Sequence, residues 1–297
     1  MTHVRPHSFQ AWWLAARPKT LIGAVVPVLI GTACAWADGV FLLRPALICL
    51  FFACLMQINA NFINDLFDFR KGTDREDRLG PERACAQGWI SAHSMKRGIA
   101  ATTLLAFLVG SLLLAYGGIE LIVLGVACVL FAFLYTAGPY PLAYKGWGDV
   151  LVVLFFGLVP VGGTYYVQAA TMSPWTILAG LACGLAVDTL LVVNNYRDRD
   201  TDAQSGKRTL IVVGGETFGR WLYWGLGVVA CLLCLPFAHR AQPLAALLPM
   251  FYLIPHYFTW RKMVHIRQGR ALNAVLGDTS RNILIWGLLF SIGLALS

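Results

Sequence analysis

The sequence predicts an all-α integral membrane protein, and three observations support this fold class. Hydrophobic residues make up 58% of the 297 residues and charged residues only 13%, whereas a soluble domain carries roughly a quarter charged residues. Apolar segments of the length that crosses a bilayer, about 17–25 residues, recur along the whole chain. Lys and Arg are concentrated between alternate apolar segments. We therefore expect one bundle of helices, a single domain over residues 1–297, and no separate soluble domain.

About nine transmembrane helices are expected, because nine apolar segments are long enough to cross the bilayer. They cover residues 21–37, 45–66, 98–116, 119–136, 148–168, 176–196, 217–238, 244–260 and 280–297. Trp and Tyr residues near several segment ends fit an interfacial aromatic belt.

The basic residues test these segments in chain order. If the N-terminus is cytoplasmic, 21 of the 23 Lys and Arg residues lie on the cytoplasmic side, before the first segment or after the second, fourth, sixth and eighth. Only Arg44 and Arg240 fall on the other side. This positive-inside pattern predicts a cytoplasmic N-terminus and a C-terminus on the opposite side. It also accounts for the net charge of +8 without a nucleic-acid partner.

Amide and acidic side chains gather where the second apolar segment ends. Asn61, Asn64, Asp65 and Asp68 are spaced i, i+3, i+4 and i+7, so a helix through them presents all four along one stripe. Carboxylates at such a boundary are costly unless a cation, or a group bound through a cation, compensates them.

A second stripe of the same kind follows the sixth apolar segment. Asn195, Asp198 and Asp202 are spaced i, i+3 and i+7, and Asn194 lies one turn before Asp198. Both stripes lie on the predicted cytoplasmic side, so they can meet at one face of the membrane.

Two facing sets of oxygen ligands suit a hard divalent cation, and Mg²⁺ is usually held by a few carboxylates together with substrate phosphates. Lys145, Lys207 and Arg208 can take the remaining phosphate charge. A magnesium-bound diphosphate at the mouth of an apolar bundle suggests a substrate with a long apolar tail, such as a polyprenyl diphosphate. The alternative is that these residues belong to solvated loops of mixed charge. Two matching stripes on the same side of the membrane disfavour this alternative.

Five segments of the chain resemble the UbiA-type membrane prenyltransferases, and within them the branch that acts on 1,4-dihydroxy-2-naphthoate. They are RPKTL from Arg17, NDLFDFRKGTD from Asn64, DRLGPER from Asp77, YTAGPYPLAYKGWGD from Tyr135 and NNYRDRDTDAQSGKRTL from Asn194. The ubiquinone branch has Asp-x-x-x-Asp in the first motif. Here Gly72 stands four positions after Asp68, and the next acidic residue is Asp74.

The resemblance implies roles for particular residues. Mg²⁺ would be bound by Asn64, Asp68, Asp198 and Asp202, with Asp74 and Asn195 as further metal ligands, and Asp65 would act with Asp68, Asp198 and Asp202 in the catalytic site. The residues expected at the diphosphate are Lys145, Lys207, Arg208, Tyr135, Arg17 and Lys19.

The resemblance also implies a reaction and a location. A polyprenyl chain would pass from its diphosphate to 1,4-dihydroxy-2-naphthoate with loss of CO₂ and diphosphate, giving demethylmenaquinone. The membrane would be the bacterial inner membrane, with the active site facing the cytoplasm.

Asp188 departs from the family pattern, because it lies inside the sixth apolar segment. Helical spacing places it on the stripe that leads to Asp198 and about 15 Å deeper. An intramembrane carboxylate is a functional candidate, and contact with a hydroxyl of the aromatic acceptor is one hypothesis. The other is a protonated Asp bonded to a neighbouring Ser or Thr.

Two further functions stay open at this point. The first is the same reaction on another aromatic acceptor, such as 4-hydroxybenzoate, which the position of Asp74 disfavours. The second is an ion-coupled membrane transporter. A transporter places its acidic residues near the bilayer midplane, whereas all the clustered acids here lie at segment ends.

Overall fold

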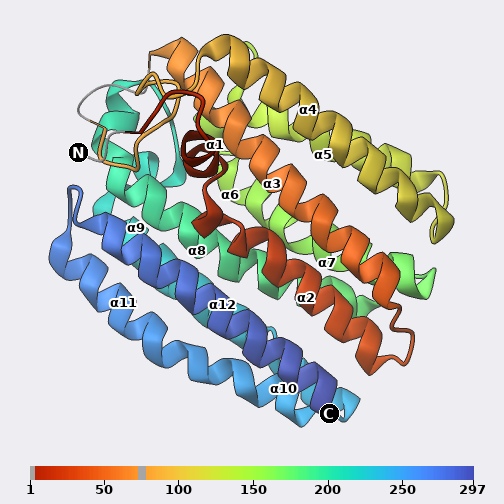
Figure 1. Ribbon diagram of the computed structural model, residues 1–297. Coiled ribbons are helices and arrows are strands. Elements are labelled where there is room, and N and C mark those ends of the chain that lie inside the picture. Colours follow the sequence, from red (N-terminus) through yellow and green to blue (C-terminus); the bar gives the residue numbers. More distant parts are fainter. Residues whose placement is uncertain (1–3, 73–77) are drawn as a thin grey trace.

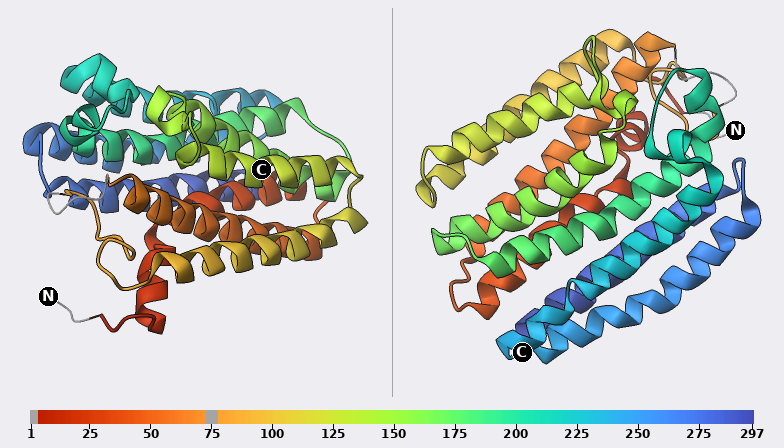
Figure 2. Two further views of the ribbon diagram at one scale, coloured as in Figure 1. Left: turned by 90° about the horizontal axis from the view of Figure 1, so that it is seen from above. Right: turned by 180° about the vertical axis from the view of Figure 1, so that it is seen from behind.

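The computed structural model describes residues 4–72 and 78–297, and in these residues the chain forms a bundle of helices without strands (Figures 1 and 2). The all-α prediction is confirmed. The α-helices are α1 (Phe9–Ala16), α2 (Ile22–Ala37), α3 (Leu43–Lys71), α4 (Ala92–Ser111), α5 (Glu120–Thr136), α6 (Gly148–Val153), α7 (Val159–Ala169), α8 (Pro174–Gln204), α9 (Leu210–Leu232), α10 (Pro243–Leu247), α11 (Leu253–Ile266) and α12 (Leu272–Leu296). Shorter helical pieces link them: η1 (Pro18–Thr20), η2 (Leu112–Ala115), η3 (Leu142–Lys145), η4 (Leu154–Leu158), η5 (Leu235–Arg240) and η6 (Leu248–Tyr252).

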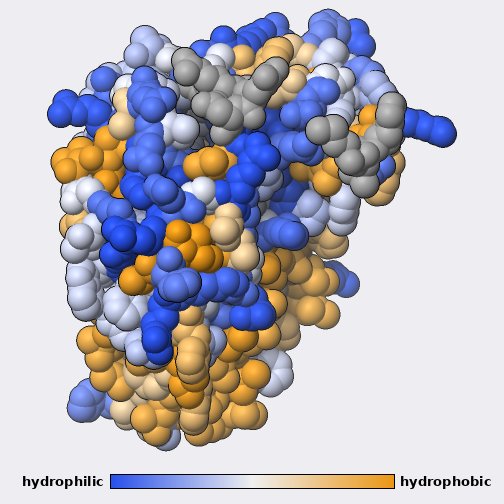
Figure 3. Space-filling model, turned by 90° about the vertical axis from the view of Figure 1, so that its left-hand side faces the viewer, coloured by the Kyte–Doolittle hydropathy of each residue, from blue (hydrophilic) through white to orange (hydrophobic). Residues whose placement is uncertain are grey.

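The long helices run side by side, with α3, α4 and α5 along one side of the bundle and α9, α11 and α12 along the other (Figure 1). Helices α2, α7 and α8 lie between them. The segments 78–91, 137–147 and 205–209 meet at one end of the bundle, which we call the polar end. Hydrophilic side chains gather over much of this end (Figure 3). The C-terminus lies at the opposite end (Figure 1).

Six helical rods in the described part of the chain are long and apolar enough to cross a membrane, and a seventh is a pair bent by 50° between Phe9–Thr20 and Ile22–Ala37. The predicted spans at 119–136 and 244–260 give shorter pieces. Helix α5 has 17 residues, and the second span is divided among α10, η6 and α11. The structure thus supports a multi-pass membrane protein, while the number nine stays a prediction.

The surfaces of the bundle match a lipid surrounding. Large apolar side chains such as Leu104, Leu108 and Val123 are exposed on α4 and α5, where water would make their exposure unfavourable. The main core forms where α2, α8 and α12 pack, around residues such as Ile30 and Trp286. Apolar residues therefore point both inward and outward, as in a helix bundle that lipid covers.

Glycines allow α8 to pack backbone to backbone against the rod formed by α6, η4 and α7. A Cβ atom on Gly184 would lie 2.7 Å from the carbonyl oxygen and 2.8 Å from the Cα of Val153. A Cβ atom on Gly157 would lie 2.4 Å from the carbonyl oxygen of Gly180. Small residues of this kind are the usual means of close helix packing in membranes. Gly157 belongs to η4, a π-helical turn, and such turns are frequent at functional sites.

Because of this packing, a single methyl group added to Gly184 should lower the stability of the protein. Gly184→Ala should lower the free energy of unfolding by about 1–3 kcal/mol, because the rigid backbone of Val153 leaves no room for the Cβ atom. Thermal unfolding in detergent measures the change. Gly225→Ala is the matched control in α9, where no atom lies within 4 Å of the new Cβ, and alanine should stabilise that helix by about 0.5–1 kcal/mol. Equal melting temperatures for the two variants would contradict the prediction.

Candidate functional site

The side chains of the acidic stripe of α3 have two different surroundings: some line the cavity inside the bundle, and one contacts a loop. Asn64 and Asp68 line the cavity, and the Thr136 hydroxyl donates a hydrogen bond to Asn64 Oδ1. Asp65 instead accepts hydrogen bonds from the backbone N–H groups of Ala84 and Cys85, each at 2.9 Å. Asp65 therefore holds segment 78–91 against α3 and does not line the cavity.

Asp68 lies against a cation that the sequence did not single out. Arg83 Nη2 is 3.1 Å from Asp68 Oδ2, and both side chains are buried. The Tyr144 hydroxyl is 3.5 Å from Asp68 Oδ1. Arg83 and Tyr144 both line the cavity. Each stands in one of the matched motifs, DRLGPER and YTAGPYPLAYKGWGD, which were the only signal for them in the sequence.

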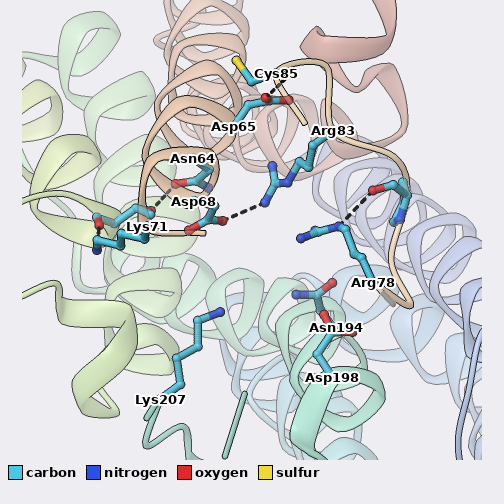
Figure 4. A network of polar contacts seen from close by, with 12 residues as sticks. Asn64, Asp65, Asp68, Lys71, Arg78, Arg83, Cys85, Asn194, Asp198 and Lys207 are labelled. Atoms are coloured by element: carbon cyan, nitrogen blue, oxygen red, sulfur yellow. Dashed lines mark hydrogen bonds and ion pairs between the residues drawn. The ribbon is translucent and has the colours of Figure 1, made fainter. Parts of the chain in front are cut away.

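The stripe of α8 faces the stripe of α3 across the cavity (Figure 4). Asn194 and Asn195 line it. Asp198 forms two short contacts with Arg197, from Nε at 2.7 Å and from Nη2 at 2.5 Å. Arg197 is buried and also donates to Asn194 Oδ1 at 2.7 Å. Arg197 therefore fixes the Asn and the Asp of this stripe in one arrangement.

Asp202 is paired with Lys207, the cation that reaches the cavity from the segment after α8. Lys207 Nζ lies 3.1 Å from Asp202 Oδ1. Burial lowers the pKa of Lys207, but the nearby charges of Asp202 and Asp68 and the hydrogen bond to Asp202 outweigh burial and raise the pKa above its ordinary value. Lys207 is therefore a cation throughout the physiological pH range.

The other residues expected at a diphosphate lie in different places. Tyr135 and Arg17 line the cavity, whereas Lys145, Arg208 and Lys19 are exposed and do not line it. The backbone N–H of Arg208 donates to the carbonyl oxygen of Tyr144, which joins segments 137–147 and 205–209 at the polar end. Asp74 lies outside the described residues.

Arg17 occupies an unusual backbone conformation at the bend between α1 and α2. Its φ and ψ angles are 53° and 69°, a left-handed conformation that costs a non-glycine residue about 1–3 kcal/mol and is found most often at functional sites. Its Nη2 atom is buried and has no hydrogen-bond partner. The bend thus directs a guanidinium donor to the cavity wall, where an anion would satisfy it.

The cavity has a volume of about 710 Å³ and extends far below the polar residues. Its wall on α3 runs from Asp68 to Cys49, which is about 28 Å along a helix axis. Leu113 and Val167 line the far end. The depth approaches the thickness of the hydrocarbon core, about 30 Å, so the cavity has room for a long apolar chain below a polar head.

The polar end offers the ligand set that Mg²⁺ takes in the presence of phosphates. In the described part of the chain, no three His, Cys, Asp or Glu side chains are grouped closely enough to hold a metal on their own. Mg²⁺, however, binds through one or two carboxylates together with substrate phosphates. Asn64 and Asp68 on one side and Asn194 and Asp198 on the other (Figure 4) fit this mode, because the phosphates would complete the set.

The chain matches the UbiA prenyltransferase family over residues 24–290. It belongs to that family. Among its relatives, the 1,4-dihydroxy-2-naphthoate octaprenyltransferase of Escherichia coli (strain K12) is 35% identical, and the match covers 100% of this chain and 99% of the relative. The enzyme of the same name from Mycobacterium tuberculosis is 36% identical over 95% of each chain.

Solved structures share the UbiA fold at low sequence identity. A UbiA homologue from Aeropyrum pernix K1 aligns with a TM-score of 0.70 and 15% identity, covering 94% of this chain and 98% of the homologue. A UbiA homologue from Archaeoglobus fulgidus bound to GPP and Mg²⁺ aligns with a TM-score of 0.63 and 15% identity, covering 95% and 99%. The chain therefore has the fold of these UbiA homologues.

The position of Asp65 predicts a change in loop accessibility. Asp65→Ala leaves two buried N–H groups without partners, at about 1–3 kcal/mol each, so segment 78–91 should separate from α3. The thiol of Cys85, which is only 5% exposed, should then react with maleimide about tenfold faster or more. Peptide mass spectrometry on protein in nanodiscs locates the label. Asp200→Ala is the control, since Asp200 is 70% exposed, and an unchanged rate at Cys85 in Asp65→Ala would contradict the role of Asp65.

Proposed function

We propose that this chain transfers a polyprenyl group from a polyprenyl diphosphate to 1,4-dihydroxy-2-naphthoate, with release of diphosphate and CO₂, to give the quinol that oxidises in air to demethylmenaquinone. The observation that carries the proposal is the position of Asp68, Arg83 and Lys207 at the mouth of an apolar cavity about 710 Å³ in volume. Relatives that carry the naphthoate octaprenyltransferase name over nearly their full length support the choice of acceptor.

The ion pairs at the cavity mouth indicate how the diphosphate binds. Asp68 is paired with Arg83 and Asp202 with Lys207. When a magnesium diphosphate binds, the carboxylates can turn to the metal and the cations to the phosphate oxygens, so no charge loses its partner. The homologue that binds GPP and Mg²⁺ supports this proposal. Asn64, Asp68, Asn195, Asp198 and Asp202 are the residues that we propose for the metal.

The protein residues have three tasks in the reaction. Asn64, Asp68, Asp198 and Asp202 would hold Mg²⁺, which when bound would supply neutralisation of the charge on the leaving diphosphate. Arg83 and Lys207 add fixed positive charge to the same oxygens, which favours cleavage of the allylic C–O bond. The apolar walls around Phe131 and Phe156 keep water from the carbocation. The electron-rich ring of the acceptor then supplies the electrons for the new C–C bond, and its carboxyl group leaves as CO₂.

Arg17 is our proposed binding residue for the carboxylate of the acceptor. Arg17 lines the cavity and its buried Nη2 has no partner, while Arg83 and Lys207 already hold the carboxylates at the mouth. A guanidinium group binds a carboxylate through two parallel hydrogen bonds. Arg17 would therefore orient the naphthoate.

The location follows from the charge pattern. We propose that the polar end faces the cytoplasm and that the bilayer is the bacterial inner membrane, because 21 of the 23 Lys and Arg residues lie in segments assigned to that side.

The acceptor can be tested directly. With a polyprenyl diphosphate in nanodiscs, we expect demethylmenaquinone from 1,4-dihydroxy-2-naphthoate only when Mg²⁺ is present, and no product from 4-hydroxybenzoate. Chromatography of the lipid extract measures both products. A product from 4-hydroxybenzoate alone would refute the proposed acceptor, and turnover in excess EDTA would refute the metal requirement. If the folded protein turned over neither acceptor, the prenyltransferase proposal would fail and the transporter alternative would be favoured.

The role of Arg17 predicts a selective effect on one substrate. Arg17→Met should raise the KM for dihydroxynaphthoate about 10- to 100-fold, because a charge-assisted hydrogen bond contributes about 1.5–3 kcal/mol. The KM for the polyprenyl diphosphate should stay within about twofold, the range expected of a residue without direct contact. Arg44→Met, an exposed arginine at the opposite end, is the control. A rise confined to the KM for the diphosphate would instead assign Arg17 to that substrate.

A further inference from the structure

Two buried carboxyl groups outside the acidic stripes lie on facing helices beside the cavity, and one of them lines it. Asp149 on α6 is 7% exposed and Asp188 on α8 is 2% exposed. The rods are antiparallel, and Val153 on α6 contacts Gly184 on α8. Asp149 lies one helical turn before Val153, and Asp188 lies one turn after Gly184, both toward the polar end. The register of the two helices therefore places Asp149 opposite Asp188. A Cβ atom on Gly148 would lie 3.3 Å from Leu191, so the same register continues past the pair.

Neither carboxyl group is satisfied within the protein. Asp149 Oδ1 and Asp188 Oδ1 are both buried without a hydrogen-bond partner. The nearest hydroxyl in the sequence, that of Thr189, donates to the carbonyl oxygen of Ala186 at 2.6 Å, so the bonded-threonine hypothesis for Asp188 finds no support in Thr189. A buried polar group without a partner is destabilising, and an ionisable residue inside a membrane-spanning segment is a candidate functional residue.

The cavity reaches this pair. Asp149 lines it together with Tyr135, Val187 and Leu191. A Cβ atom on Gly148 would lie 3.5 Å from the Tyr135 hydroxyl oxygen, so Tyr135 lies next to the start of α6. Asp188 lies behind Asp149, outside the lining residues. The wall at this depth therefore contains a carboxyl group, that of Asp149.

We infer that Asp149 binds a ring hydroxyl of the aromatic acceptor, and that Asp188 positions the Asp149 carboxyl group from behind. The inference rests on the proposed function. An isoprenoid tail has no donor for these oxygens, whereas each hydroxyl of a dihydroxynaphthoate has one. Arg17 lines the same cavity, and in this arrangement it would hold the carboxylate of the acceptor while Asp149 holds a hydroxyl. Such a site selects its substrate by the hydroxyl group, because an analogue without it leaves Asp149 unpartnered.

The test compares two analogues that each lack one hydroxyl, 1-hydroxy-2-naphthoate and 4-hydroxy-2-naphthoate. Both are measured as competitive inhibitors, so that ring reactivity does not enter. In the wild type, one analogue should bind about tenfold or more weakly than the other, as expected for one lost hydrogen bond to a carboxyl group. In Asp149→Leu, the two inhibition constants should agree within about twofold, because the discriminating group is gone. Asp188→Leu should reduce the ratio without abolishing it.

Controls separate a specific contact from a change in the fold. The KM for the polyprenyl diphosphate should be unchanged in both variants. Asn282→Leu removes another buried side chain whose Oδ1 has no partner and which does not line the cavity, and it should keep the wild-type ratio. If a leucine variant fails to fold in thermal unfolding, Asp149→Asn and Asp188→Asn keep the shape and should still shift the ratio.

The outcomes distinguish this inference from the proposed function. A wild type that turns over dihydroxynaphthoate, with variants that keep its analogue ratio, would overturn the inference alone and leave the pair as a site for water or a structural feature. A wild type that does not use dihydroxynaphthoate would overturn the proposed acceptor and this inference together.

Discussion

The carboxylates of α3 and α8 lie at the mouth of an apolar bundle because cations of the same chain neutralise them. Arg83 is paired with Asp68, Arg197 with Asp198, and Lys207 with Asp202. Without these partners, the buried carboxylates of Asp68 and Asp202 would each destabilise the bundle by several kcal/mol. Because Arg83 and Lys207 come from loops, those loops must cover the polar end. The need for charge neutrality therefore determines both the polar site and the loops around it.

The shape of the cavity depends on a second constraint, the close packing of α8 against the rod formed by α6, η4 and α7. Gly157, Gly180 and Gly184 bring α8 against η4 so tightly that no side chain enters between them. Space is then left on the other side, between α3, α4, α5 and α7. A tight interface beside an open one lets the bundle keep a long apolar channel and a fixed wall for the polar groups.

The sequence was sufficient for features that depend on local spacing. The helical stripes of α3 and α8 required only the helix period, and Asn64 and Asp68 do face Asn194 and Asp198 (Figure 4). The sequence was insufficient where the path of a loop determines which groups a side chain contacts. Asp65 shares the stripe of α3 but bonds to segment 78–91, and the exposure of Lys145 depends on the path of η3. Arg83 was missed because its pairing with Asp68 is a tertiary contact, without a local pattern.

Asp188 departs from the family pattern, and the residues around it in the structure are needed to interpret that departure. From the sequence, a carboxylate in an apolar helix could equally be a buried structural acid. The helix register places it opposite Asp149, and Asp149 lines the cavity while Asp188 does not. A buried pair with unpartnered oxygens lowers stability, and it is retained where binding a ligand compensates that loss. The cavity would thus have three levels: cations and carboxylates at the mouth for a diphosphate, hydrogen-bond groups below for an aromatic ring, and apolar walls for the tail. From the mouth inward, the polarity of these levels decreases. It decreases in the same way from the diphosphate through the aromatic ring to the isoprenoid tail when both substrates are held for transfer.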